Sequence, residues 1–422
     1  MFGGSSKKAY ICSLIEGNMK IGFDAKRLFN NFTGLGNYSR TMIDILTTYV
    51  PEHQYLLYSP KIIENHVTMP YLENTSCRTI IPSGMMRGSL WRTYGMASAL
   101  SHDEVDLFHG LSNEIPVGLE RQHIPSVVTI HDVAFHTFPD MYRWHDRMIY
   151  DRKWKYACRH ANHIIAISES TKADILRFYK VPEEKISVVY QPVNGVYYEA
   201  KAELSQFDKL MTSPQDLQGV GEQCPKELKP GDGKSYMLYV GSINSRKNLM
   251  GIVKAMELLP ADLQIPLTIV GEGKEYKHEV EQYIAEHHLE HLFQWTTAID
   301  STSLKRLYAN ATLFLYPSFY EGFGLPVVEA LLSGCPVLTS NTSSLPEAGG
   351  PGSLKVDPKN VEEIRDGIVT ILTNDALRNQ MIEEGRQYAI KTFHPETLAR
   401  KVEEVYNKVK WESPSFSHLR GK

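Results

Sequence analysis

Residues 318–338 read SFYEGFGLPVVEALLSGCPVL, and this stretch holds the features from which the fold is predicted. It follows the apolar run TLFLYPS at 312–318 and leads through two glycines and a proline into a second apolar run. Proline suits the first turn of a helix, and glycine lets the backbone approach a ligand closely. The stretch therefore predicts a strand end, a glycine loop and a helix, with Glu321 in the loop and Glu329 about one turn into the helix.

Short apolar runs alternate with amphipathic runs on both sides of this stretch. Strands are predicted at 20–25, 105–110, 126–132, 163–168 and 186–192, and again at 236–242, 266–271, 312–318 and 336–341. Strands that alternate with helices imply parallel sheets with right-handed crossovers. We therefore predict an α/β protein with two doubly wound, parallel-sheet (Rossmann-like) domains that face each other across a cleft.

The alternation breaks in two places. Residues 200–234 mix Lys, Glu, Gln, Gly and Pro without periodicity, and we interpret them as a linker or insertion between domains at 19–199 and 235–392. Residues 393–422 are expected to form a long final helix, about 396–411, and a tail. Residues 1–18 have a short apolar run and no small-residue cleavage site, so we expect a tag-like leader or an upstream start rather than a signal peptide.

Composition excludes several classes of protein. The chain has 422 residues, which suits two domains, and its net charge of -4 gives no reason to expect a nucleic acid partner. No apolar run approaches the roughly 20 residues that span a bilayer. The five cysteines form no CxxC pair, which is typical of a reducing compartment and indicates neither a disulfide nor a metal signature. We expect a cytoplasmic protein.

Two predicted strand ends in the first half carry candidate functional residues, because ligands of such sheets bind beyond the carboxyl ends of the strands. The sequence TGLGNYSR places Gly34 and Gly36 before a helix expected to start near Asn37, where free N–H groups could bind an anion. The alternative is a tight turn that simply requires glycine. His131 follows another strand and could titrate or donate a hydrogen bond, or could be a capping or packing residue.

In the second half, the loop GSINSRKNL at 241–249 places Arg246 and Lys247 directly before a helix. Two cations there oppose the helix dipole unless an anion lies between them. A diphosphate would satisfy both, since Arg offers a planar fork and Lys a point charge. The alternative is a pair of solvated surface cations.

The two glutamates of the opening stretch are acceptors suited to paired hydroxyls, as on a ribose or a hexose. Glu329 alone could instead be a first-turn acid that offsets the helix dipole. That alternative accounts neither for Glu321 nor for the glycines between the two. No pair of aspartates occurs at i and i+2, so we predict no metal site, and protein cations would have to meet the charge of a diphosphate.

Taken in order, these segments resemble a known family. The stretch from Glu321 to Glu329 resembles the E-x7-E motif of retaining glycosyltransferases of family 4, which have the GT-B fold, and GSINSRKN resembles their phosphate-binding loop. TGLGNYSR and TIHD resemble the donor loop and the active-site histidine region of the amino domain. The resemblance extends from Met19 to about residue 410 and excludes 200–234.

The resemblance implies transfer of a hexose, with retention at the anomeric carbon, from a nucleotide diphosphate sugar bound by the domain at 235–392 to an acceptor bound by the domain at 19–199. It also implies that the final helix crosses back to the first domain. It implies catalytic roles for His131, Glu321, Arg246 and Lys247, with Glu321 on the transferred hexose and Glu329 on the ribose. The expected donor-binding set is Gly34, Gly36, Gly241, Arg246, Lys247, Glu321, Gly322, Phe323, Gly324, Leu325 and Glu329. No cofactor or metal is expected, and the S-R-K-N loop favours GDP-mannose as the donor.

The expected acceptor is a glycan or a lipid-linked glycan of cell-surface polysaccharide or lipopolysaccharide synthesis. Residues 141–160 carry six Lys or Arg and several aromatics, so this helix could rest on the anionic inner face of the cytoplasmic membrane. The alternative is a solvated amphipathic helix. A nucleotide-sugar epimerase or phosphorylase on the same fold, and a binding protein without turnover, remain alternatives to the transferase.

Overall fold

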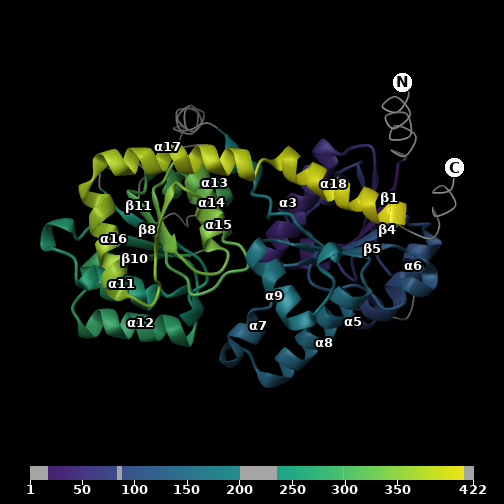
Figure 1. The fold of residues 1–422 in the computed structure, drawn as a ribbon, viewed down its shortest axis with the longest axis horizontal. Coiled ribbons are helices and arrows are strands. Elements are labelled where there is room, and N and C mark those ends of the chain that lie inside the picture. The colour runs from purple at the N-terminus through teal and green to yellow at the C-terminus, as the bar shows by residue number, and fades with distance from the viewer. Residues whose placement is uncertain (1–17, 83–87, 200–234, 298, 413–422) are drawn as a thin grey trace, which may run out of the picture. The chain divides into compact units, whose positions relative to one another are not determined.

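The computed structural model describes residues 18–82, 88–199, 235–297 and 299–412. The predicted linker at 200–234 and all but the last residue of the predicted leader lie outside these ranges. The chain divides into two compact units. The first consists of Met1–Ile167, Lys172–Pro192 and Glu396–Lys422, and the second consists of Ser168–Thr171 and Val193–Pro395. Figure 1 labels many of the elements of both units.

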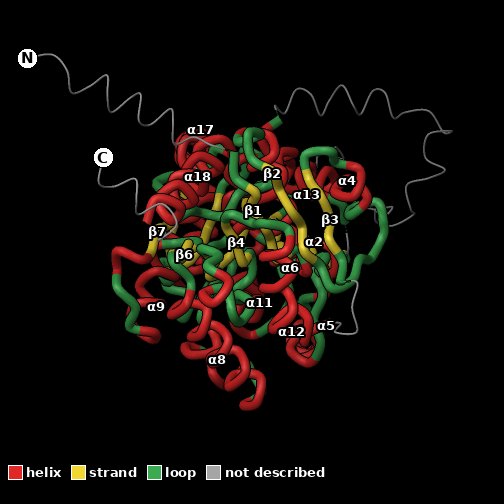
Figure 2. Tube along the Cα trace, turned by 90° about the vertical axis from the view of Figure 1, so that its right-hand side faces the viewer, coloured by secondary structure: helices red, strands yellow, loops and turns green. Residues whose placement is uncertain are grey.

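The first unit contains a seven-stranded parallel sheet in the order β3-β2-β1-β4-β5-β6-β7. Its strands are β1 (Lys20–Asp24), β2 (Gln54–Tyr58), β3 (Cys77–Ile80), β4 (Leu107–Gly110), β5 (Ser126–Ile130), β6 (His163–Ala166) and β7 (Ile186–Val188). The order is doubly wound, because the chain builds outward from β1 and then outward from β4 in the opposite direction. Figure 2 labels β7, β6, β4, β1, β2 and β3 in this order across the sheet.

Helices cover both faces of this sheet. They are α2 (Lys26–Asn30), α3 (Gly34–Tyr49), α4 (Met69–Glu73), α5 (Gly88–Leu90), α6 (Met96–His102), α7 (Ala134–Thr137), α8 (Trp144–His160), α9 (Glu169–Tyr179), whose first residues belong to the second unit, and α18 (Pro395–Glu412). The last helix, α18, buries Leu398, Val402, Val405 and Val409 in the same core as the inner face of α3. Their spacing of three and four residues is that of a single helix face.

The second unit repeats the plan with six parallel strands in the order β10-β9-β8-β11-β12-β13. The strands are β8 (Met237–Val240), β9 (Leu267–Val270), β10 (Phe293–Thr296), β11 (Leu313–Tyr316), β12 (Val337–Ser340) and β13 (Ser353–Val356). The helices are α11 (Leu249–Glu257), α12 (Glu275–Glu286), α13 (Ser301–Asn310), α14 (Leu325–Leu332), α15 (Leu345–Gly349), α16 (Val361–Thr373) and α17 (Asp375–Thr392). The predicted α/β class with two doubly wound parallel sheets is confirmed.

Burial accounts for most, but not all, of the strands that the sequence revealed. The central strands β4, β5, β8, β9, β11 and β12 are buried at every position, as expected for strands covered by helices on both faces. The edge strands β3, β10 and β13 include partly exposed residues and were not predicted. The edge strand β7 was predicted, whereas β2, which lies inside the sheet and is buried at four of its five positions, was missed. None of the described helices is both long and apolar enough to cross a membrane.

Candidate functional site

The second unit brings two predicted loops together at its topological switch point. Strands β8 and β11 are neighbours, yet the chain leaves them toward opposite edges of the sheet. The crevice beyond the carboxyl ends of two such strands is where open α/β sheets bind ligands. The loop after β8 contains Arg246 and Lys247, and the loop after β11 contains Glu321. Glu321 therefore meets two cations that precede it in the chain by 74 and 75 positions.

Glu321 lies between both cations. Its Oε2 is 2.9 Å from Nη1 of Arg246, and its Oε1 is 2.9 Å from Nζ of Lys247. The hydroxyls of Ser318 and Tyr316 donate to the same Oε1 at 2.8 and 3.2 Å. Lys247 also contacts the hydroxyl and the ring face of Tyr316. Four side chains thus hold the carboxylate. Arg246, Lys247 and Glu321 together carry a net charge of one positive unit.

This cluster is buried, and burial sets its electrostatics. Glu321 is 8% exposed and Lys247 is 9% exposed. Burial by itself would raise the pKa of Glu321, but Lys247 and Arg246 outweigh it and lower the pKa to about 2. The carboxylate is therefore charged at every physiological pH. The cluster is a fixed cationic site, because neither Arg246 nor Lys247 is left to solvent as a surface charge.

Polar side chains that the sequence analysis did not single out hold the loop after β11 in place. Ser344 donates to the carbonyls of Glu321 and Phe323 at 2.8 and 2.7 Å, and Ser343 accepts from the N–H of Glu321 at 3.0 Å. The loop after β8 is anchored by Asn248, whose amide donates to the carbonyls of Pro317 and Pro358. Asn248 has a φ of 57°. Its place in the S-R-K-N motif was the only sequence signal for this role.

The glycines of both loops have distinct structural reasons. Gly324 precedes α14 with a φ of 117°, and a Cβ there would lie 2.8 Å from Cδ2 of Leu345. Gly241 has a φ of 151°, and a Cβ would lie 3.3 Å from Cδ of Lys247. The carbonyl of Gly322 accepts from Ser168 at 2.7 Å. At both φ values a side chain would be strained, so glycine is required for the loop shape.

The neighbouring apolar residues of the motif serve the core or begin the helix. The Phe323 side chain is buried against Phe393, with ring centroids 5.4 Å apart, so only its backbone could face a ligand. Leu325 is the first residue of α14 and is partly buried.

Glu329 has a different set of partners from Glu321. The Tyr308 hydroxyl donates to its Oε2 at 3.2 Å, and the Tyr197 hydroxyl also hydrogen bonds to it. Burial raises the pKa of Glu329 to about 7, although both hydrogen bonds oppose the shift. Tyr197 lies in the short turn Gly195–Tyr198, which Lys305 anchors by donating to the Val196 carbonyl at 2.6 Å. Neither tyrosine was predicted, because no local pattern links them to the motif.

In the first unit, Gly34 and Gly36 lie inside the first turn of α3 rather than before it. The helix begins at Gly34, so the expected start near Asn37 was wrong. The side chain of Asn31 is the reason, since its Oδ1 accepts from the N–H groups of Thr33 and Gly36 at 3.0 Å. A Cβ on Gly36 would lie 1.7 Å from the Asn31 carbonyl oxygen. Gly36 is therefore required for this close contact, and its N–H already has an acceptor.

His131 is buried at the end of β5 with both ring nitrogens engaged. Its Nε2 lies 2.8 Å from the Leu111 carbonyl, which can only accept, so Nε2 carries the proton. Its Nδ1 then accepts from the Gln191 amide at 2.9 Å. The imidazole also packs edge-on against the Tyr38 ring, with ring centroids 4.5 Å apart. Burial lowers the pKa of His131 to about 4, so the imidazole is neutral at physiological pH.

Known families match both halves of the chain. Residues 53–195 match the model Glycosyltransferase Family 4, and residues 222–388 match Glycosyl transferases group 1. The first match lies almost entirely in the first unit and begins after β1 and α3, and the second match lies in the second unit. The chain is a family 4 glycosyltransferase. This result confirms the family inferred from the E-x7-E and S-R-K-N motifs.

Individual relatives of this glycosyltransferase agree with that assignment. It is 28% identical over 376 residues to the O-antigen chain mannosyltransferase B of Escherichia coli, a match that covers 85% of this chain and 92% of the relative. It is 24% identical over 316 residues to the O-antigen chain mannosyltransferase RfbU of Salmonella typhimurium, with 72% and 78% covered.

Solved structures share the fold of this glycosyltransferase. HepE of Anabaena, crystallised with UDP, matches with a TM-score of 0.66 at 17% identity, over 92% of this chain and all of that one. WaaG, described as a glycosyltransferase involved in lipopolysaccharide biosynthesis, matches with a TM-score of 0.63 at 18% identity, over 91% and 99%. The GT-B fold expected from the sequence is thereby confirmed.

Proposed function

We propose that this glycosyltransferase moves mannose from GDP-mannose to a glycan or lipid-linked acceptor with retention at the anomeric carbon. The observation that carries the proposal is the buried cluster of Arg246, Lys247 and Glu321 at the switch point of the second unit. Its surplus positive charge suits a diphosphate, and we propose that the two cations act without a metal ion. The choice of mannose is supported by relatives that are O-antigen mannosyltransferases.

The cluster would act most strongly when the leaving group departs. As the bond between the anomeric carbon and the phosphate oxygen breaks, negative charge grows on the diphosphate, and the fixed cations Arg246 and Lys247 stabilise it. Glu321 would accept hydrogen bonds from hydroxyls of the transferred hexose while it keeps both cations oriented. Glu329 would hold the ribose hydroxyls.

Retention is proposed to follow from attack on the same face. The acceptor hydroxyl forms the new bond to the anomeric carbon as the phosphate bond breaks, and the departing phosphate oxygen takes the hydroxyl proton. Glu321 is a poor nucleophile because two cations hold its charge. The neutral, doubly hydrogen-bonded His131 would contact the sugar or the phosphate without exchanging protons.

The acceptor is proposed to belong to cell-surface polysaccharide or lipopolysaccharide synthesis in the cytoplasm. The names of the relatives support this setting, since two of them are O-antigen chain mannosyltransferases. A lipid-linked acceptor would require the enzyme to work at a membrane surface.

Donor identity and turnover are tested in two steps. A thermal shift panel with GDP, UDP, ADP and their sugars should show the largest stabilisation with GDP and GDP-mannose, because a ligand that binds only the folded state raises its stability by mass action. The wild type should then transfer radiolabelled mannose from GDP-mannose to lipid extracts, and proton NMR of the product should show an α linkage. A larger shift with UDP would refute the donor, and a β linkage would refute retention.

We also propose that α8 makes peripheral contact with an anionic membrane. Three apolar side chains on this helix are exposed to solvent, with Trp144 at 73%, Met148 at 44% and Ile149 at 46%. Basic residues such as Arg147 and Lys155 lie on the same helix. Apolar side chains combined with basic ones favour the interface of an anionic bilayer.

Co-sedimentation with vesicles of phosphatidylglycerol and phosphatidylcholine tests this contact. The double variant Arg147→Glu/Lys155→Glu should lose most of the vesicle binding of the wild type, at about 1 kcal/mol per charge near the surface. Lys153 is left intact, because it is paired with Glu114 at 3.0 Å. Equal sedimentation of the two proteins would refute the contact.

A further inference from the structure

The first unit contains a pocket of about 460 Å³ near the ends of α8 and α9 that the proposed transfer does not use. Four cations line it: Lys155 and Arg159 on α8, Lys180 directly after α9, and Lys185 directly before β7. Two residues separate α8 from β6, and residues 180–185 connect α9 to β7. The pocket therefore lies beside the amino ends of β6 and β7, whereas His131 follows the carboxyl end of β5.

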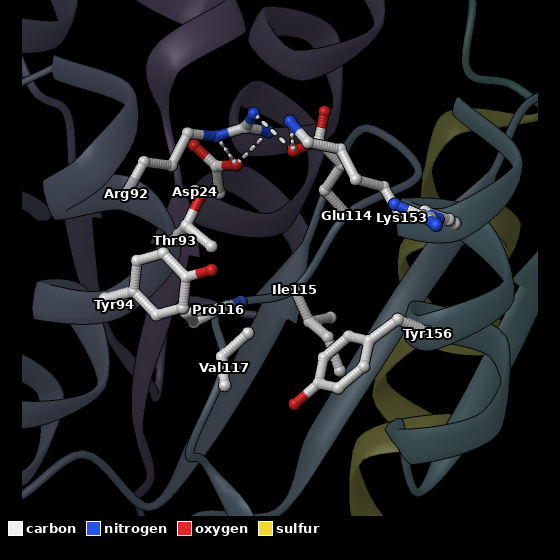
Figure 3. A pocket seen from close by; sticks show the side chains of 11 residues that line it. Asp24, Arg92, Thr93, Tyr94, Glu114, Ile115, Pro116, Val117, Lys153 and Tyr156 are labelled. Carbon is white, nitrogen blue, oxygen red and sulfur yellow. Dashed lines mark hydrogen bonds and ion pairs between the residues drawn. The ribbon is translucent and has the colours of Figure 1, made fainter. Parts of the chain in front are cut away.

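Carboxylates of the described residues do not compensate these cations. None of the four forms an ion pair within the described ranges, and neither Asp nor Glu lines the pocket. The cations at the carboxyl ends of the same sheet are paired instead: Arg92 lies 2.5 Å from Asp24, and Lys153 lies 3.0 Å from Glu114 (Figure 3). Four uncompensated cations around one pocket are a set of charges that an anionic ligand would neutralise.

Helix ends alone do not require this many cations. One cation at the end of a helix already offsets the helix dipole, and Lys185 caps α8 by donating to the Arg159 carbonyl at 2.7 Å. Lys155 and Arg159 lie four positions apart on α8, where like charges repel and destabilise a helix. The number and the spacing of these cations therefore indicate a binding role.

The positive charge near this pocket also acts on a buried histidine. Burial is the main reason that the pKa of His163 falls to about 4, and the charges of Lys408 and Lys185 contribute to the fall. Burial lowers the pKa of Lys185 as well. Glu120 attracts Lys185, but its carboxylate lies 2.9 Å from Nδ1 of His160 and does not line the pocket. The potential at the amino ends of β6 and β7 is therefore positive.

We propose that this pocket binds the phosphate group of a ligand other than the sugar-nucleotide donor. A phosphate ester carries a charge of about −1.5 to −2 at neutral pH and three acceptor oxygens, so it neutralises more of the four cations than a carboxylate does. Arg159 offers a planar fork of donors, and the ammonium of Lys185 keeps further N–H groups after it donates to the Arg159 carbonyl.

The size of the pocket leaves room for more than the phosphate. Its volume lies within the range of about 300–1,000 Å³ that holds small organic ligands, so an organic group attached to the phosphate fits as well. Free phosphate esters and the headgroups of anionic lipids share this chemistry.

Isothermal titration calorimetry of the GDP-saturated enzyme with glycerol 3-phosphate tests the assignment. GDP is added so that the proposed diphosphate site at Arg246 and Lys247 is occupied during the titration. We expect saturable binding to the wild type, and Arg159→Gln/Lys180→Gln should weaken the dissociation constant about tenfold, because two charge-assisted hydrogen bonds are lost. Both side chains are exposed, so their replacement leaves the core intact. Lys155 is kept, because the vesicle test of α8 uses it.

The double variant Lys61→Gln/Arg78→Gln is the matched control. It removes one lysine and one arginine from exposed positions of the same unit that do not line the pocket, so the dissociation constant should stay within about twofold. The affinity for GDP, measured in a separate titration, is the folding control and should be the same in all three proteins.

Co-sedimentation with vesicles of phosphatidic acid and phosphatidylcholine distinguishes the two sources of phosphate. A loss of glycerol 3-phosphate binding in Arg159→Gln/Lys180→Gln identifies a free ester as a sufficient ligand. A loss of vesicle binding alone identifies the headgroup of an anionic lipid. Either outcome supports a phosphate site in this pocket.

Two results would overturn the assignment. One is that neither probe shows binding that Arg159→Gln/Lys180→Gln weakens, and the other is that the control variant weakens binding as much as the pocket variant does. The proposed function fails separately. Phosphate binding that depends on Arg159 and Lys180, without any transfer from GDP-mannose, would refute the transfer and leave this site standing.

Discussion

Replacement of Glu321 by glutamine should destabilise the protein while it leaves the proposed diphosphate site strongly cationic. The substitution keeps the shape of the side chain and removes the charge that lies 2.9 Å from both Arg246 and Lys247. Breaking a buried ion pair by removing one partner costs about 3–5 kcal/mol, because the remaining charge is left buried and uncompensated. GDP should bind the variant at least as tightly as the wild type, since its diphosphate no longer shares the cations with a carboxylate, whereas mannose transfer should fall.

The lowered pKa of Glu321 gives a second, independent value for the contribution of its ion pairs to the free energy of unfolding. A shift from 4.5 to about 2 corresponds to about 3 kcal/mol of stability at pH 7. Because the pKa is lower in the folded state, this stabilisation is present above pH 4.5 and is lost as the pH falls toward 2. The contribution should therefore fall to about 2 kcal/mol at pH 3.5.

Urea unfolding of the wild type and Glu321→Gln at pH 7 and pH 3.5 measures both effects. The exposed Glu362 on α16 provides a control, and Glu362→Gln should change the free energy of unfolding by less than about 0.5 kcal/mol. Calorimetric titration with GDP gives the binding arm. A loss below about 1 kcal/mol at pH 7, or a loss that does not shrink with acid, would refute the account of this cluster.

Three further predictions follow from single contacts. Removing the hydroxyl in Tyr308→Phe should raise the pKa of Glu329 above its value of about 7, because the hydroxyl donates to the carboxylate. The pH midpoint at which GDP affinity falls with acidification should therefore be higher in the variant. Calorimetry that finds the same midpoint in both proteins would contradict this prediction. Gly324→Ala should cost about 1–3 kcal/mol, because its φ of 117° and the close approach to Leu345 both oppose a side chain, and an unchanged melting temperature in differential scanning calorimetry would argue against this strain. The pH profile of kcat/KM between pH 5.5 and 8.5 should contain no inflection from His131, since burial holds its pKa at about 4; an inflection that disappears in His131→Gln would show that this residue titrates in the enzyme.

The local sequence was sufficient to predict two parallel-sheet domains and the loops that contain Arg246, Lys247 and Glu321. Central strands of a parallel sheet are buried on both faces, so they appear as continuous apolar runs such as those at β8 and β11. Glycine and proline between a strand and a helix marked the loop that contains Glu321. Edge strands such as β3 and β10 are partly exposed, and their mixed composition left no equally clear pattern.

The pairing of distant residues was decided only by the tertiary structure. Sequence placed Arg246, Lys247 and Glu321 in two loops, but only the adjacency of β8 and β11 makes them one buried cluster. In the same way, the buried ion pair of Arg92 and Asp24 in the first unit joins residues that lie 68 positions apart along the chain. The order of strands in a sheet arises from long-range packing, and a local pattern of apolar and polar residues does not encode which strand will lie beside which.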